Sequence, residues 1–274
     1  MSIGTQQTGL RAIDARGISA LVRDGDCQRT VVCLHGIGSN AASFAPLMAV
    51  WPQGPMLLAW TAPGYGASIA LQKEWPVADD YALALASSLD AQELPNVDLV
   101  AHSLGCLIGC AFARRFPGRV RRLALLSPAL GYSVPPGTVL PPAIAARITD
   151  LDELGAAKFA AARAARLVFQ PERKPDVFAA VRDAMAQVTL PGYAQAVRML
   201  ASGDLIADAS ALSQPITIAN GIEDVITPKA GAERLHAACA ESQLTLVPDA
   251  GHALPQEAPE TIVRVLAGSF GGAA

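Results

Sequence analysis

Three polar side chains, Ser103, Asp224 and His252, follow one another along this chain in an order that suits nucleophilic catalysis. A serine hydroxyl is a weak nucleophile until an imidazole accepts its proton, and the imidazole needs a carboxylate that fixes its tautomer. Ser103 stands in Ala-His-Ser-Leu-Gly at residues 101–105, a near match to the Gly-x-Ser-x-Gly turn between a strand and a helix. Small residues two positions either side of the serine allow this tight turn, and Ala101 still meets that requirement. The sequence therefore predicts that Ser103 is held out of a sheet at the start of a helix.

The chain has four histidines, and their positions favour His252 as the base. His35 precedes the serine segment and His102 lies inside it, while His236 falls within a predicted helix, where a packing or surface role is the default. His252 follows the last predicted strand, so we expect it at the sheet edge on which Ser103 also opens. The chain order Ser, Asp, His supports a proton relay.

The acid of this relay is expected in the loop 221–228, between the serine and the histidine. Asp224 is the first choice, and the adjacent Glu223 is the alternative. Either carboxylate would otherwise serve a turn or capping role ahead of the helix that Pro228 opens. Thr227 is better placed to cap that helix, which favours the catalytic interpretation of Asp224.

Two backbone N–H groups are expected to stabilise the oxyanion that forms when a serine attacks a carbonyl. One comes from Leu104, directly after the nucleophile, and the other from the loop after residues 30–34, with Ile37 as the first choice. His35 and Gly36 are expected to shape that loop rather than to react.

The elements that must position these residues alternate between strand and helix. Mostly apolar runs predict strands at residues 30–34, 56–60, 97–101, 120–126, 215–219 and 244–247. Helical patterns occupy residues 79–94, 104–116, 231–240 and 259–270. This alternation is typical of a parallel sheet covered on both faces, and two short runs between residues 11 and 23 predict an antiparallel hairpin at its edge.

The alternation is interrupted between residues 135 and 207, where the chain is Ala-rich, helix-prone and punctuated by prolines, without a convincing strand. Such an insertion predicts a helical lid over the strand ends. The predicted organisation is therefore a core in two parts, residues 1–134 and 208–274, with the lid at 135–207.

Composition excludes several classes of function. The chain has 274 residues, of which 51% are hydrophobic and 16% charged, so a large buried core is expected. A net charge of −3 with scattered arginines argues against nucleic acid as a partner, and the longest apolar run, 104–113, is too short to cross a membrane.

Localisation and ligands follow from the same composition. Residues 1–17 lack the apolar segment of a signal peptide, and the five cysteines lack zinc-site spacing and are interpreted as small core residues. These features predict a cytoplasmic protein without metal or cofactor, whose partner is a small-molecule substrate. The oligomeric state stays open.

Five short segments, in the right order, resemble the α/β-hydrolase fold family. They are His35-Gly36, residues 63–68, residues 101–105, residues 221–228 and Gly251-His252. The resemblance implies an α/β fold, with a mostly parallel sheet of about eight strands covered by helices and a helical lid insertion. It also implies that Ser103 is the nucleophile, Asp224 the acid and His252 the base.

A weaker similarity connects residues 192–205 and the strand after them with 3-oxoadipate enol-lactonases. The His35-Gly36 pair, Thr61 and Ala101 depart from those enzymes. The similarity suggests that one of the lid arginines reaches inward to a substrate carboxylate, although most of them are expected to be solvated surface charges. The arginines concerned are Arg147, Arg163 and Arg166.

The predicted function is therefore hydrolysis of a small ester, lactone or thioester through a Ser-His-Asp triad and an acyl-enzyme. The first alternative is a carbon–carbon bond hydrolase of the meta-cleavage product type, which uses the same residues. An alternative of another class is a non-catalytic small-molecule receptor on the same fold. A receptor has no need of a proton relay, so the presence of all three residues argues against it.

Overall fold

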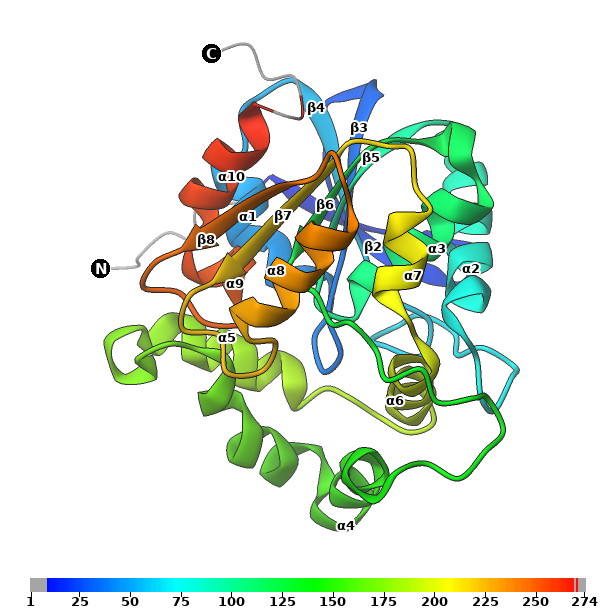
Figure 1. Cartoon of the computed structure of the whole chain (residues 1–274), viewed down its shortest axis with the longest axis vertical. Helices are drawn as coiled ribbons and strands as arrows, with labels where there is room; N and C mark the ends of the chain where they lie inside the picture. The colour runs from blue at the N-terminus through cyan, green and yellow to red at the C-terminus, as the bar shows by residue number, and fades with distance from the viewer. Residues whose placement is uncertain (1–8, 269, 271–274) are drawn as a thin grey trace.

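A single eight-stranded sheet organises the computed structural model, which describes residues 9–268 and Phe270 (Figure 1). The strands are β1 (Leu10–Ala15), β2 (Ile18–Arg23), β3 (Asp26–Leu34), β4 (Pro55–Trp60), β5 (Val97–His102), β6 (Val120–Leu126), β7 (Ile216–Gly221) and β8 (Gln243–Val247). They lie in the order β1-β2-β4-β3-β5-β6-β7-β8. All pairs from β4 to β8 are parallel, while β1 and β2 form an antiparallel hairpin at one edge. The predicted mostly parallel sheet with an edge hairpin is confirmed.

Helices cover both faces of this sheet. They are α1 (Ala45–Val50), α2 (Ala78–Asp90), α3 (Gly105–Arg115), α4 (Pro142–Arg163), α5 (Pro175–Met185), α6 (Gly192–Ser202), α7 (Leu205–Ser210), α8 (Lys229–Ala238), α9 (Leu254–Glu257) and α10 (Pro259–Ala267). Short 3-10 turns are η1 (Ala41–Phe44), η2 (Pro117–Arg119), η3 (Ala164–Leu167) and η4 (Pro171–Arg173). Figure 1 shows α1 and α10 on one side of the sheet and α2 and α3 on the other.

Two apolar clusters pack these helices against the sheet, because alternate side chains of a strand point to opposite faces. In β3, Val31 and Cys33 belong to the cluster that contains the buried residues of α1 and α10. Val32 and Leu34 belong to the larger cluster, which contains those of α2 and α3. The second half of β3 is therefore buried on both faces, as the continuous apolar run 30–34 predicts.

Residues 127–215, all of them described, contain helices and no strand. Figure 1 shows α4, α5 and α6 gathered at one end of the sheet. Residues of these helices share a cavity with Ser103 and with the loops that follow β6 and β7, so the helices lie over the carboxyl edge of the strands. Helix α4 bends at Gly155, whose φ of 71° is not helical.

Some predicted boundaries and burials were wrong. The helix expected over 79–94 ends at Asp90, because Glu93 adopts a left-handed φ of 56° and the Leu94 N–H turns back to the Leu89 carbonyl. Cys27 is exposed rather than in the core, because β3 begins before the covered part of the sheet; the other cysteines are buried.

The prediction about a leader segment falls partly on residues 1–8, which lie outside the described residues. Within the described part of the chain, no helix combines the length and the apolar character needed to cross a membrane.

Candidate active site

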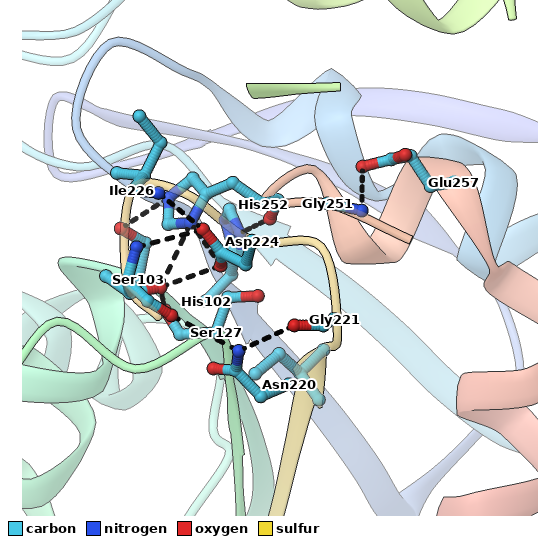
Figure 2. Close-up of polar contacts among 12 residues, drawn as sticks. His102, Ser103, Ser127, Asn220, Gly221, Asp224, Ile226, Gly251, His252 and Glu257 are labelled. Carbon is cyan, nitrogen blue, oxygen red and sulfur yellow. Dashed lines mark hydrogen bonds and ion pairs between the residues drawn. The ribbon is translucent and has the colours of Figure 1, made fainter. Parts of the chain in front are cut away.

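Ser103 occupies the sharp turn between β5 and α3, where its φ of 52° is left-handed (Figure 2). A non-glycine residue is strained in this conformation, and the surrounding structure must hold it there. The Ser103 N–H donates to the Leu126 carbonyl of β6 at 2.9 Å. A Cβ atom added to Gly105 would lie 2.3 Å from the Leu34 carbonyl oxygen, so only glycine fits two residues after the serine. The turn thus has the form that the sequence predicts.

Ala101, at the position where glycine is the commoner residue of this motif, is accommodated by a second glycine. A Cβ on Gly109, in α3, would lie 3.3 Å from the Ala101 Cβ. The methyl group of Ala101 therefore occupies space that the missing side chain of Gly109 leaves open.

The structure brings Ser103, His252 and Asp224 together from three separate loops. The Ser103 Oγ lies 3.0 Å from His252 Nε2, and His252 Nδ1 lies 2.9 Å from Asp224 Oδ2. Each of the three residues is at least 96% buried. The alternative acid, Glu223, is exposed, whereas Asp224 is the carboxylate that contacts the imidazole.

Four donors surround the Asp224 carboxylate. Oδ1 accepts from the N–H groups of Ile226 (2.8 Å) and Thr227 (2.9 Å), and Oδ2 accepts from the Thr227 hydroxyl (2.8 Å) and from His252. Burial alone would raise the pKa of Asp224, but the bonds and charge of His252 and the bonds from Thr227 outweigh it and lower the pKa to about 2. An ionised carboxylate only accepts, so His252 Nδ1 carries the proton and Nε2 is free to take the serine proton.

Thr227 has a role that the sequence analysis missed. It was predicted to cap the next helix, but α8 starts at Lys229 after Pro228, with no side-chain cap. The hydroxyl of Thr227 instead lies 2.8 Å from Asp224 Oδ2, 3.1 Å from the Ser127 carbonyl and 3.2 Å from His252 Nδ1. Pro228 itself occupies the N-cap position of α8, so Thr227 lies one residue outside the helix and its hydroxyl is free for other contacts.

His35 and His102 are buried and hold backbone rather than the serine. His35 Nε2 accepts from the Ala62 N–H at 3.0 Å, so its Nδ1 donates to the Gly36 carbonyl at 2.8 Å. Burial lowers the pKa of His35 to about 4, and burial together with the charge of His252 lowers the pKa of His102 to about 3. His102 Nε2 contacts the carbonyl oxygen of His252 at 2.7 Å, so this neutral ring donates to the main chain of the candidate base.

The loop after β3 approaches Ser103 closely, as the prediction for Ile37 requires. A Cβ on Gly36 would lie 3.0 Å from the Ser103 Cβ and 3.4 Å from its Oγ, and Ile37 lines the same cavity as Ser103. Leu104 lies at the start of α3, directly after the serine. Their N–H groups would supply the two donors of an oxyanion hole, the prediction made from the sequence.

Ser103 and His252 open into a cavity of about 470 Å³ between the sheet edge and helices α4 to α6. Apolar side chains make much of its wall, among them Phe159, Leu167, Met185 and Leu200. Among the described residues, four arginines also line the cavity, and no aspartate or glutamate does; the arginines are Arg147, Arg163, Arg166 and Arg234. Such a wall excludes water from a reacting carbonyl and favours a ligand that carries negative charge.

The arginines differ in their surroundings. Arg163 is paired with Asp150, and its guanidinium lies 4.8 Å from the centre of the Phe159 ring. Arg147 is half-buried near Tyr193: burial raises the pKa of the Tyr193 hydroxyl, and the positive charge of Arg147 opposes this rise. No ion pair of Arg147 occurs among the described residues. Arg166 and Arg234 are exposed.

Across residues 9–268, no three His, Cys, Asp or Glu side chains come together as a metal site would need.

The sequence and the fold are similar to those of known hydrolases. The model of the alpha/beta hydrolase family matches residues 31–265. A 2-hydroxy-6-oxo-2,4-heptadienoate hydrolase of Pseudomonas putida is 36% identical over 126 residues, a match that covers 45% of this chain and 45% of that protein. A relative from Variovorax paradoxus, named for carbamate hydrolysis, is 29% identical over 231 residues, or 81% of this chain and 84% of its own.

Among solved structures, an enol-lactonase of Burkholderia xenovorans superposes with a TM-score of 0.82 at 22% identity. The superposition covers 95% of this chain and 99% of that one, so the two share their fold almost throughout.

Proposed function

The chain belongs to the alpha/beta hydrolase family, and from that premise we propose that it is a serine hydrolase with Ser103 as nucleophile, His252 as general base and Asp224 as the acid that orients it. The observation that carries the proposal is the buried relay of 3.0 Å and 2.9 Å contacts through the imidazole. These distances lie within the range that proton transfer requires.

The proposed reaction begins with attack of the Ser103 Oγ on a substrate carbonyl while His252 Nε2 takes the hydroxyl proton. The oxyanion is stabilised by the N–H groups of Leu104 and Ile37. His252 then gives the proton to the leaving oxygen or sulfur, which leaves an acyl-enzyme. Water, deprotonated by the same imidazole, releases the acid and restores Ser103.

The proposed substrates are small esters, lactones or thioesters that carry a carboxylate away from the reacting bond. Support comes from the cavity wall, which contains arginines and, in the part of the chain that the structure describes, no acidic side chain. Arg147 is the proposed partner of the substrate carboxylate, because it is half-buried, while Arg163 already pairs with Asp150. A bidentate guanidinium–carboxylate pair in such a setting is strong and geometrically specific.

We further propose that residues 135–207 form a lid over the two core parts, 1–134 and 208–274. The support is that helices α4 to α6 complete the cavity wall opposite Ser103. The lid would keep bulk water from the acyl-enzyme.

A fluorophosphonate reagent tests the proposed chemistry, since it reacts only with an activated serine. We expect stoichiometric labelling of the wild type and none of Ser103→Ala. Labelling that persists in Ser103→Ala, or no labelling of the wild type, would contradict the proposal and favour a receptor.

A panel of charged and neutral esters or lactones of equal size tests the anion preference. We expect Arg147→Met to remove a preference of roughly 10-fold or more for the charged members, the worth of about 1.4 kcal/mol in a charged hydrogen bond. Arg264→Met serves as the matched control, because Arg264 is an exposed arginine of α10 outside the cavity. Equal rates for charged and neutral substrates in the wild type would refute the preference.

Hydrolysis of a carbon–carbon bond is the second candidate. The similarity to the heptadienoate hydrolase of Pseudomonas putida favours it, because the two chains match in part at 36% identity. A 2-hydroxy-6-oxo-dienoate in the same panel distinguishes the candidates: turnover of the dienoate with slow ester cleavage would favour the carbon–carbon reaction.

A further inference from the structure

Glu257 of α9 is a charged side chain buried away from solvent, five residues after His252. Its carboxylate has no exposed surface. Oε1 accepts from the Gly251 N–H at 3.0 Å, and Oε2 accepts from the Phe169 N–H at 3.0 Å and from Lys174 Nζ at 2.8 Å (Figure 2 draws the Gly251 bond). A carboxylate is tolerated at such depth only when it is paired and hydrogen-bonded, and Glu257 is both.

The donors to Glu257 come from two segments that are far apart in the sequence. Gly251 directly precedes His252, while Phe169 and Lys174 belong to the chain between η3 and α5, inside the proposed lid. Glu257 and its three donors, Gly251, Phe169 and Lys174, are called here the Glu257 junction.

Further bonds connect the same two segments. Lys174 Nζ also donates to the Asp249 carbonyl at 2.6 Å, and the Ala253 N–H donates to the Leu167 carbonyl at 2.9 Å. The main chain is therefore tied to residues 167–174 both before and after His252.

The two segments are in close contact at Gly251. A Cβ added to Gly251 would lie 2.9 Å from the Phe169 nitrogen and 3.1 Å from Glu257 Oε1. A displacement of the lid segment toward Gly251 would therefore move the backbone next to the imidazole.

We propose that Glu257 and Lys174 are positioning residues for His252, so that the docked lid segment holds the base in line with Ser103. This inference rests on the proposed function. The relay depends on two contacts of 3.0 Å and 2.9 Å made by one ring, and a backbone shift of a fraction of an ångström changes both. One part of the lid, residues 167–174, therefore stays packed against the segment that carries His252 and does not move away from it.

The test compares Lys174→Met, Lys174→Arg and Glu257→Gln with the wild type. Lys158→Met is the matched control, because Lys158 is an exposed lysine of α4, away from the junction. Fluorophosphonate labelling at its endpoint counts active sites, and its initial rate reports how well His252 activates Ser103. Ester turnover gives kcat per titrated site and KM, and thermal unfolding gives stability.

We expect Lys174→Met and Glu257→Gln to lower both kcat per titrated site and the labelling rate roughly 10- to 100-fold, the loss typical of a misplaced catalytic group. KM should change less than threefold, Lys174→Arg should recover most of the loss, and Lys158→Met should match the wild type. If Glu257→Gln does not fold, the Lys174 pair alone decides.

The outcomes separate the two proposals. A wild type that the reagent does not label overturns the proposed function, and this inference with it. A labelled wild type whose Lys174→Met variant loses only stability or active fraction, with unchanged kcat and labelling rate per titrated site, overturns this inference alone.

Discussion

Asp224→Asn is the sharpest perturbation of the proposed relay, because it preserves the shape of the side chain and removes its charge. The N–H groups of Ile226 and Thr227 can still donate to the remaining oxygen. The new amide nitrogen then faces His252 Nδ1 and donates to it, which moves the ring proton to Nε2. An imidazole protonated at Nε2 cannot accept the proton of Ser103.

Two magnitudes follow. Turnover should fall roughly 10⁴-fold, as expected when the wrong tautomer is imposed on the base of a serine hydrolase. Stability should fall by about 2–3 kcal/mol at pH 7, because the pKa of Asp224 is lowered from 3.8 to about 2 on folding and each unit is worth about 1.4 kcal/mol. A pKa lowered by folding stabilises the protein above pH 3.8, and this contribution is lost as the pH falls towards 2.

Urea unfolding of wild type and variant between pH 2 and pH 7, with ester kinetics at pH 7, measures both quantities. The difference in unfolding free energy should stay constant above about pH 4 and shrink below it. Glu223→Gln is the matched control, since this neighbouring carboxylate is exposed and should cost little in either assay. A larger loss in Glu223→Gln than in Asp224→Asn would refute the assignment of the acid.

Three other outcomes are expected. Ser103→Ala, His252→Ala and their double variant should show nearly equal residual rates, because the two residues act as one unit; multiplicative losses would count against the relay. Thr227→Val should lower kcat roughly 10-fold and raise the pKa of Asp224, because a hydrogen bond to a charged group is lost. Thr227→Ser should restore kcat, and an unchanged kcat in Thr227→Val would show that the hydroxyl does not contribute to catalysis. Gly105→Ala should lower the free energy of unfolding by about 1–3 kcal/mol or more, because its Cβ would lie 2.3 Å from a carbonyl oxygen; an unchanged unfolding curve would contradict this.

The sheet could be predicted from the sequence because its central strands are buried on both faces. The run 56–60 has no polar interruption, and β4 covers those residues. The proximity of Ser103, Asp224 and His252 was predictable for a related reason: each follows a strand, and parallel strands end at one edge.

Other parts of the site depend on contacts that no local pattern encodes. Thr227 has the residue type of a helix cap, and only the approach of His252 and Ser127 from other segments explains its position. Glu257 ends the short segment Leu-Pro-Gln-Glu, which gives no sign of a buried carboxylate, and its burial follows from the lid segment packed against it. Helix α9 is too short to show a period.

Ala101 and Gly109 share one small volume between β5 and α3, and this makes the two positions interdependent in evolution and in engineering. Alanine at both would press the methyl groups to 3.3 Å, closer than carbon atoms at van der Waals contact. Exchanging the two residues would conserve the volume and replace a glycine inside a helix by alanine, a change that favours helix α3 by roughly 0.5–1 kcal/mol. Ala101 and Gly109 thus pack as a pair. Alanine is tolerated two residues before the serine because residue 109, one helical turn beyond the 101–105 motif, is glycine.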